Sequence, residues 1–110
     1  MEDKRIKVKL ISIYFGKLPD WMPIWLKSCS KNQNYDFLLI TDQDYSNNIA
    51  ENVEIKKMNW DDLKQKFSNA LQMSISLVKP YKLCDFRPVF GRTFFDEVKG
   101  YDFWGHCDLD

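Results

Sequence analysis

The feature that most constrains this fold is an alternation of short apolar runs with stretches of helical periodicity. Residues 8–15 are rich in β-branched and aromatic side chains and are followed by Gly16, and residues 37–40 are apolar without interruption. A continuous apolar run of this length is typical of a strand covered on both faces of a parallel sheet. Residues 53–58 alternate between apolar and polar side chains, which predicts a strand nearer an edge. Residues 101–107 are expected to form a fourth strand.

Helical patterns separate these runs. One helix is predicted from Asp20, a candidate N-cap, to the polar cluster at residues 31–34, because Pro23 is tolerated in a first turn. A second helix is predicted after Asn59, which forms a capping arrangement with Asp62, whereas residues 68–76 are ambiguous. Helical spacing relates Trp21, Ile24, Trp25 and Ser28 in the first helix, and Trp60, Leu63 and Phe67 in the second.

Two prolines organise the next segment. A helix is expected to begin at Pro80 and to end before Pro88, because proline disfavours helical geometry in the residue that precedes it. Pro88 can open another helix, with Gly100 as its C-terminal cap. Phe90, Phe94 and Val98 would share one side of that helix.

This succession predicts a single α/β domain over residues 1–110, a Rossmann-like parallel sheet with flanking helices. With 45% hydrophobic residues, the chain can close one core of this kind. Ligands of such sheets bind beyond the carboxyl ends of the strands. Those ends are residues 14–16, Asp42, Asn59 and residues 108–110. We expect them to gather along one edge.

Composition excludes several classes of protein. Sixteen basic residues balance 16 acidic ones, and they are scattered, which argues against a nucleic-acid partner. Cys29, Cys84 and Cys107 show no Cys-x-x-Cys spacing, so neither a disulfide framework nor a zinc site is indicated. The N-terminal apolar run is too short for a signal peptide or a transmembrane segment. We expect a cytoplasmic protein that can associate with the inner face of a membrane.

The motif Asp108-Leu109-Asp110 follows the last expected strand. Two aspartates at positions i and i+2 of an extended chain point the same way and can reach one divalent cation. Mn²⁺ or Mg²⁺ is the expected cofactor, because such ions are often shared between carboxylates and substrate phosphates. The spacing alone is weak evidence, since Asp42-Gln43-Asp44 repeats it in what reads as a solvated loop. The aromatic strand before Asp108 favours the second pair as metal ligands.

A family resemblance rests on longer stretches. Residues 79–88 and 100–110 look like a bacterial family of glycosyltransferases associated with surface-polysaccharide genes, and residues 13–19 and 37–42 match as well. The resemblance covers nearly the whole chain. More distantly, the chain resembles the GT-A superfamily, which includes mannosyltransferase-like and clostridial-toxin glucosyltransferases. This resemblance implies the N-terminal nucleotide-binding half of a GT-A fold with strand order 3-2-1-4, truncated at its C-terminus.

The resemblance also implies donor contacts. In GT-A relatives a Ser-Asp-x-x-Arg-like helix contacts the nucleotide sugar, and Cys84-Asp85-Phe86-Arg87 is the nearest match here, with Cys for Ser and Arg one residue closer. Arg87 offers a planar fork for a diphosphate, and Asp85 can accept hydrogen bonds from sugar hydroxyls. The alternative for both is an exposed local ion pair. Lys82 is a candidate phosphate contact, or a solvated lysine.

Further candidates lie at the first two strand ends. Tyr14 and Phe15 can stack on a nucleobase or pack in the core, and Gly16 permits close approach of the backbone. Asp42 can accept from a ribose or base group, or serve as a turn residue. The aromatic pair Phe103 and Trp104, by contrast, is expected in the core.

The expected function is metal-dependent transfer of a hexose from a UDP- or GDP-sugar to a carbohydrate acceptor, with the metal activating the leaving diphosphate. The general base is expected downstream of Asp110, so the 110-residue chain is expected to be inactive alone. One alternative is a non-catalytic α/β domain that binds a nucleotide or a partner. Another is an Asp-x-Asp phosphohydrolase, which is disfavoured because the first strand ends without an acidic nucleophile.

Overall fold

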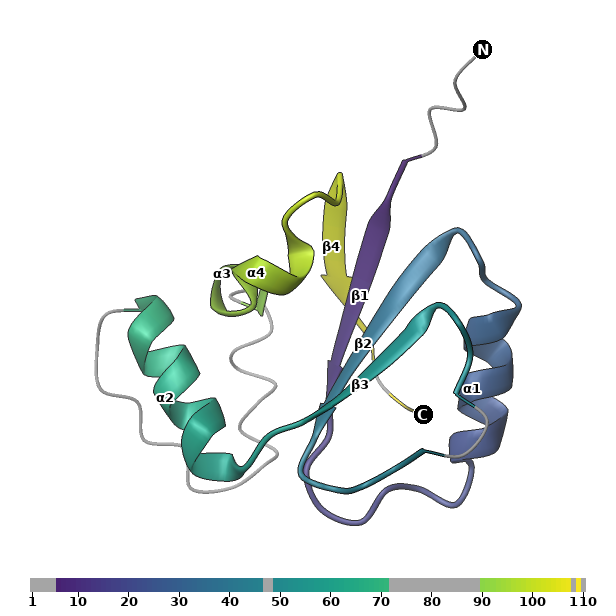
Figure 1. Cartoon of the computed structure of the whole chain (residues 1–110), viewed down its shortest axis with the longest axis horizontal. Coiled ribbons are helices and arrows are strands. Elements are labelled where there is room, and N and C mark those ends of the chain that lie inside the picture. Colours follow the sequence, from purple (N-terminus) through teal and green to yellow (C-terminus); the bar gives the residue numbers. More distant parts are fainter. Residues whose placement is uncertain (1–5, 47–48, 72–89, 108, 110) are drawn as a thin grey trace.

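A four-stranded parallel sheet forms the centre of the molecule (Figure 1). The computed structural model describes residues 6–46, 49–71, 90–107 and 109. The strands are β1 (Val8–Ile13), β2 (Tyr35–Thr41), β3 (Val53–Lys57) and β4 (Phe103–His106). They are paired in the order β3-β2-β1-β4, and every pair is parallel. The predicted Rossmann-like α/β fold and the predicted strand order are therefore confirmed.

Strand β2 shows why its sequence is apolar without a break. Leu38 and Ile40 belong to the hydrophobic cluster on one face of the sheet, whereas Phe37 and Leu39 belong to clusters on the other. All four side chains are at most 8% exposed. A strand covered on both faces needs apolar residues at odd and even positions alike. Strand β3 lies at the edge of the sheet, as its alternating pattern predicted.

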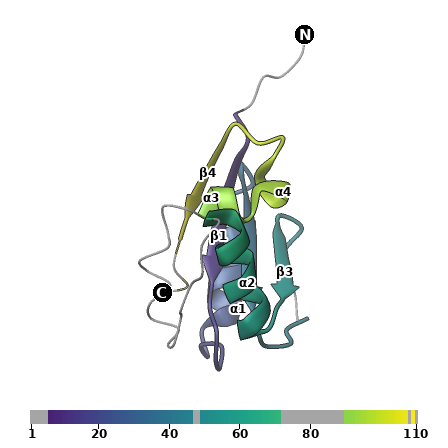
Figure 2. The ribbon, with the colours of Figure 1, turned by 90° about the vertical axis from the view of Figure 1, so that its left-hand side faces the viewer.

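Helices cover the two faces unequally. Helix α1 (Met22–Ser30) lies on one face, and α2 (Trp60–Leu71), α3 (Phe90–Thr93) and α4 (Phe95–Val98) lie on the other (Figure 1). Figure 2, viewed from the side of α2, shows the sheet between these two layers. No helix in the described part of the chain is long and apolar enough to cross a membrane.

The larger core cluster lies between the sheet and α2. Phe67 and Phe94 pack edge to face, with ring centroids 6.2 Å apart, and both are fully buried. On the opposite face, α1 inserts Met22, Leu26 and Cys29 against the sheet. Burial of each large apolar side chain contributes about 1.5–3 kcal/mol, so these two layers carry most of the favourable energy.

Two helix starts were predicted from capping residues, with different outcomes. The Asn59 side chain accepts a hydrogen bond from the Asp62 N–H at 2.7 Å, which confirms the predicted cap of α2. The cap of α1 is Trp21 rather than Asp20, and no side chain caps its amides. The prediction for Asp20 was wrong because the helix begins one residue later than expected, with Pro23 in its first turn.

The single helix predicted between Pro88 and Gly100 is also wrong. Two short helices, α3 and α4, are interrupted at Phe94, whose backbone angles (φ −109°, ψ 41°) are not helical. Phe94 is fully buried, and the break accompanies insertion of its ring beside Phe67. Gly100 adopts a φ of +90°, as expected of a glycine just beyond a helix end. The helix predicted from Pro80 lies outside the described residues, and α2 extends to Leu71.

The two aromatic residues of β4 correct another expectation. Phe103 and Trp104 are 62% and 37% exposed, so they are not core residues. The reason is the position of β4, which is the outermost strand beside β1. Side chains of an edge strand receive less cover from the helices that pack over the centre of the sheet.

Candidate functional site

The carboxyl ends of the parallel strands meet along one edge, which we call the carboxyl edge: residues 14–16 after β1, Asp42 after β2, Asn59 after β3, and Cys107 and Leu109 after β4. The gathering of these strand ends was predicted, and it is confirmed for the described residues. This is the edge at which parallel α/β sheets bind ligands.

The ends of β1 and β2 are joined through Asp42. The Gly16 N–H and the Gln43 side-chain amide both donate to Asp42 Oδ1, each at 2.9 Å. Gly16 adopts a φ of +98°, which an L side chain rarely tolerates, so glycine allows this turn. The bond from Gln43 and then the bond from Gly16 lower the pKa of Asp42 below its usual value. Asp42 is therefore ionised at neutral pH.

The second oxygen of Asp42 remains available. Among the described residues no hydrogen bond to Asp42 Oδ2 is found, and the residue is only partly buried. Asp44, the other acid of this Asp-x-Asp, forms an exposed ion pair with Lys57 at 3.0 Å. The two carboxylates thus contact different neighbours, which agrees with the interpretation of this motif as a loop.

The two aromatic candidates after β1 separate into different environments. Phe15 is only 9% exposed and packs edge to face against Trp60, with ring centroids 5.2 Å apart. Phe15 is therefore a core residue, and its ring is not available to stack on a nucleobase. Tyr14 is 36% exposed at the same edge. Its N–H donates to the Ile40 carbonyl at 2.9 Å, which fixes the backbone beneath the ring.

The middle residue of the Asp108-Leu109-Asp110 motif is anchored at the carboxyl edge. The Trp21 indole N–H donates to the Leu109 carbonyl at 2.9 Å, across 88 positions of sequence. The Leu109 side chain is 5% exposed and packs with Met22 and Leu39. These contacts fix residue 109 between the start of α1 and the end of β2.

The chain just before the motif is held as firmly. The Cys107 N–H donates to the Ile11 carbonyl at 3.1 Å, and the Ser12 hydroxyl donates to the Cys107 carbonyl at 2.7 Å. No pattern in the sequence marks Ser12 or Trp21 as residues that position the motif. The contact between Ser12 and Cys107 follows directly after the last pair of the β1–β4 register, Ile11↔His106.

The remaining candidates lie outside the described residues: Lys82, Asp85, Arg87, Asp108 and Asp110. Within the described ranges no cluster of three or more His, Cys, Asp or Glu side chains could hold a metal ion. Cys29 offers no nucleophile, because burial, and then the neighbouring Cys107 thiol, raise its pKa to about 12. Of the described candidates, Tyr14, Gly16 and Asp42 remain accessible at the edge.

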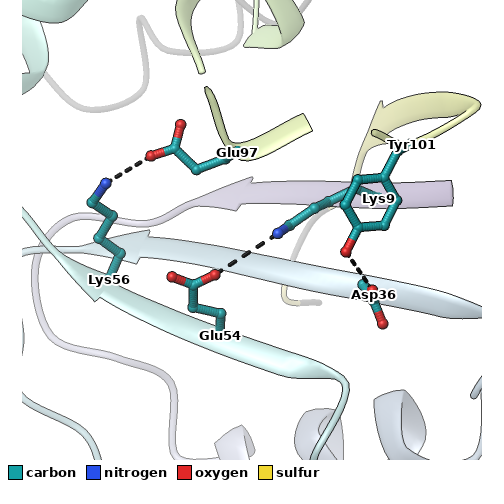
Figure 3. A network of polar contacts seen from close by, with 6 residues as sticks. All are labelled: Lys9, Asp36, Glu54, Lys56, Glu97 and Tyr101. Atoms are coloured by element: carbon teal, nitrogen blue, oxygen red, sulfur yellow. Dashed lines mark hydrogen bonds and ion pairs between the residues drawn. The ribbon is translucent and has the colours of Figure 1, made fainter. Parts of the chain in front are cut away.

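A second polar cluster lies on the face of the sheet that α4 covers (Figure 3). The Tyr101 hydroxyl donates to Asp36, and the Lys9 ammonium lies 5.1 Å from the centre of the Tyr101 ring and 3.8 Å from a Glu54 oxygen. Burial, and then the bond to Asp36, raise the pKa of Tyr101 to about 12. The protonated Tyr101 hydroxyl bonds Asp36 and its ring lies beside Lys9, and these contacts hold the segment before β4 against the sheet.

The fold defines a class: a parallel α/β domain whose strand ends gather at the edge where sheets of this kind bind ligands. Residues 10–110 match DUF6625, a family of unknown function. The chain belongs to this family, and the match includes both the carboxyl edge and the Asp108-Leu109-Asp110 motif. Comparison with curated proteins and comparison with solved structures each gave no match.

Proposed function

We propose that this chain is the nucleotide-sugar-binding half of a metal-dependent glycosyltransferase. The observation that carries the proposal is the anchoring of Leu109 at the carboxyl edge, through the Trp21 indole and the packing of its side chain on Met22 and Leu39. Because Leu109 is held in place, the two aspartates on either side of it would be positioned at the edge where α/β sheets bind ligands.

The nucleoside part of a UDP- or GDP-sugar has two accessible partners at this edge. The exposed Tyr14 ring offers a stacking surface for the base, and a stacked base typically contributes about 1–3 kcal/mol. Asp42, ionised and with one oxygen free of described hydrogen bonds, can accept from a ribose hydroxyl. Gly16 lets the ligand approach the backbone between them.

In this proposal the diphosphate lies toward the end of β4, and Asp108 and Asp110 hold Mn²⁺ or Mg²⁺ beside it. The ion would neutralise the charge that develops on the departing diphosphate. Arg87 and Lys82 are the proposed phosphate contacts, and Asp85 is the proposed sugar contact. The acceptor is a carbohydrate hydroxyl, whose activation needs a general base other than the residues described here.

The decisive experiment is calorimetric titration of UDP, GDP and their sugars into the chain, with and without Mn²⁺. We expect Mn²⁺-dependent binding that weakens at least tenfold in the Asp108→Ala/Asp110→Ala variant. A matched control is Asp96→Ala/Glu51→Ala, which removes the same charge from two exposed positions before β4 and β3. Tyr14→Ala should weaken binding about tenfold, as loss of one stacking contact predicts.

Three results would contradict the proposal. Equal loss in the control variant would mean that general charge, and not the motif, governs binding. Tight nucleotide binding that ignores both Mn²⁺ and the motif substitutions would favour a non-catalytic nucleotide-binding domain. Release of inorganic phosphate from a phosphomonoester would favour a phosphohydrolase.

A further inference from the structure

The outer face of α1 carries apolar side chains that the described structure leaves largely or partly uncovered. The helix buries Met22, Leu26 and Cys29 against the sheet, yet Trp21 and Ile24 are 47% and 69% exposed. Helical spacing grouped Trp21, Ile24, Trp25 and Ser28 on one face of this helix. Trp25 packs against Phe37 of the core, whereas Trp21, Ile24 and Ser28 are exposed. In Figure 1, α1 and the loops beside it lie on the side of the sheet away from α2, α3 and α4.

Two lysines continue this face toward the C-terminal end of the helix. Lys27 and Lys31 follow Ile24 at i+3 and i+7, spacings that keep side chains on one side of a helix. Both are exposed, and neither forms an ion pair with a residue that the structure describes. Trp21, Ile24, Lys27 and Lys31 together are called the α1 patch.

We propose that the α1 patch docks this protein on an anionic lipid bilayer. Tryptophan and isoleucine can enter the boundary between headgroups and acyl chains, while lysines beside them meet anionic headgroups. The aliphatic stems of the lysines can lie along the apolar region with the ammonium groups in water. A surface that joins these two kinds of side chain matches both layers of a membrane interface.

The hydrogen bonding of Trp21 suits this role. A buried indole N–H that lacks an acceptor opposes transfer of the ring into an apolar medium. Here the N–H already donates to the Leu109 carbonyl at 2.9 Å. The exposed part of the ring can therefore enter the bilayer boundary without an unpaired donor.

A second copy of the chain is a poorer occupant. A two-fold interface places the same patch on both subunits, so four lysines without a described acidic partner would gather in one interface. Anionic headgroups supply opposite charge instead. Because Trp21 also contacts Leu109, docking through the α1 patch would bring the carboxyl edge close to the membrane surface.

The test is flotation of the full chain with vesicles of phosphatidylcholine alone or mixed with phosphatidylglycerol. We expect binding to the mixed vesicles that weakens as salt rises. Lys27→Gln/Lys31→Gln should lower the partition coefficient about thirtyfold, because each lysine near an anionic surface contributes about fivefold. Ile24→Ser should lower it about tenfold.

Matched controls come from the opposite face of the sheet. Phe95→Ser removes a side chain that is 62% exposed on α4, and Lys64→Gln/Lys99→Gln removes two lysines from α2 and the end of α4. Neither control should change partitioning more than twofold. The inference does not rest on the proposed function, so Asp108→Ala/Asp110→Ala should retain vesicle binding.

Absence of flotation by the wild-type chain would overturn the proposal, and so would equal binding to vesicles with and without phosphatidylglycerol. Equal losses in the α1 variants and their controls would show that binding does not use this patch. The substituted side chains are exposed, apart from the half-buried control residue Lys64, and the thermal unfolding of each variant checks that its fold is intact.

Discussion

Replacing Asn52 with alanine is expected to lower the free energy of unfolding by about 2 kcal/mol, although Asn52 lies in a connecting segment. Asn52 is 7% exposed. Its side-chain Nδ2 donates to the carbonyls of Cys29 at 2.8 Å, Tyr35 at 3.0 Å and Asn32 at 3.2 Å. One amide thereby ties the end of α1, the turn after it and the start of β2 to the start of β3.

The expected loss in the free energy of unfolding follows from the number of hydrogens on the Asn52 side-chain amide. The amide has two N–H bonds for three carbonyls, so its loss removes the equivalent of two hydrogen bonds, each contributing about 1 kcal/mol. Where a carbonyl keeps a backbone N–H donor, the free-energy cost of losing its hydrogen bond from Asn52 is at the low end of the usual range. The Cys29 carbonyl keeps the Asn32 N–H at 2.9 Å, and the Asn32 carbonyl keeps the Tyr35 N–H at 3.0 Å.

Urea unfolding followed by circular dichroism measures this change as a lower midpoint at an unchanged slope. In thermal unfolding the midpoint should fall by about 8 °C. Asn69→Ala is the matched control, because Asn69 is exposed on α2 and, among the residues that the structure describes, its side chain accepts one hydrogen bond, from Gln65 at 2.8 Å. Its substitution should change stability by less than about 0.5 kcal/mol.

Asn52→Asp gives a sharper version of the test. A carboxylate facing three carbonyl oxygens is destabilising, and its pKa must rise above that of the unfolded chain. The penalty is therefore full at neutral pH and shrinks as pH falls through the raised pKa, because protonation restores an O–H donor. If Asn52→Ala loses no more stability than Asn69→Ala, or if Asn52→Asp shows no recovery in acid, the assigned role of Asn52 is refuted.

Two further predictions concern pH. The pKa of Asp42 is lowered in the folded chain, so its charge stabilises the fold at pH values above the pKa of the unfolded chain, and this effect is lost as pH falls. Asp42→Asn should therefore lower the free energy of unfolding by less than about 1 kcal/mol at pH 7. In urea titrations this difference should disappear below about pH 3. An equal difference at both pH values would contradict the bonds assigned to its carboxylate. The pKa of Tyr101 is raised to about 12, so its contribution is complete below about pH 10 and declines toward pH 12. Tyr101→Phe should lower the free energy of unfolding by about 1 kcal/mol at pH 7, and its urea unfolding curve should approach that of the wild type by pH 12. A difference between the two curves that widens as pH rises would refute the hydrogen bond to Asp36.

The sheet could be predicted because its signals are local. The unbroken apolar run at residues 37–40 requires cover on both faces, and the alternating run at residues 53–58 suits an edge. Parallel crossovers and their handedness then restrict the topology, so the gathering of strand ends at one edge follows from the order of elements. The cap formed by Asn59 was predictable for the same reason, since its partner Asp62 lies three positions along the chain.

The missed features depend on residues far apart in the chain. Asn52 bonds a carbonyl 23 positions away, Trp21 bonds one 88 positions away, and Ser12 bonds one 95 positions away. No spacing rule links such pairs. Phe103 and Trp104 were expected in the core from their apolar character, but strand order exposes them.

The sequence by itself determined the α/β class and the edge at which Tyr14, Gly16, Asp42 and Leu109 meet, because the hydrophobic period and the handedness of the crossovers are local properties of the chain. The strand order was implied by the family resemblance. The tertiary structure alone decided which of these side chains are available. It buried Phe15 against Trp60, left Tyr14 at the surface and turned Ile24 outward, since burial depends on which distant helix packs over each position.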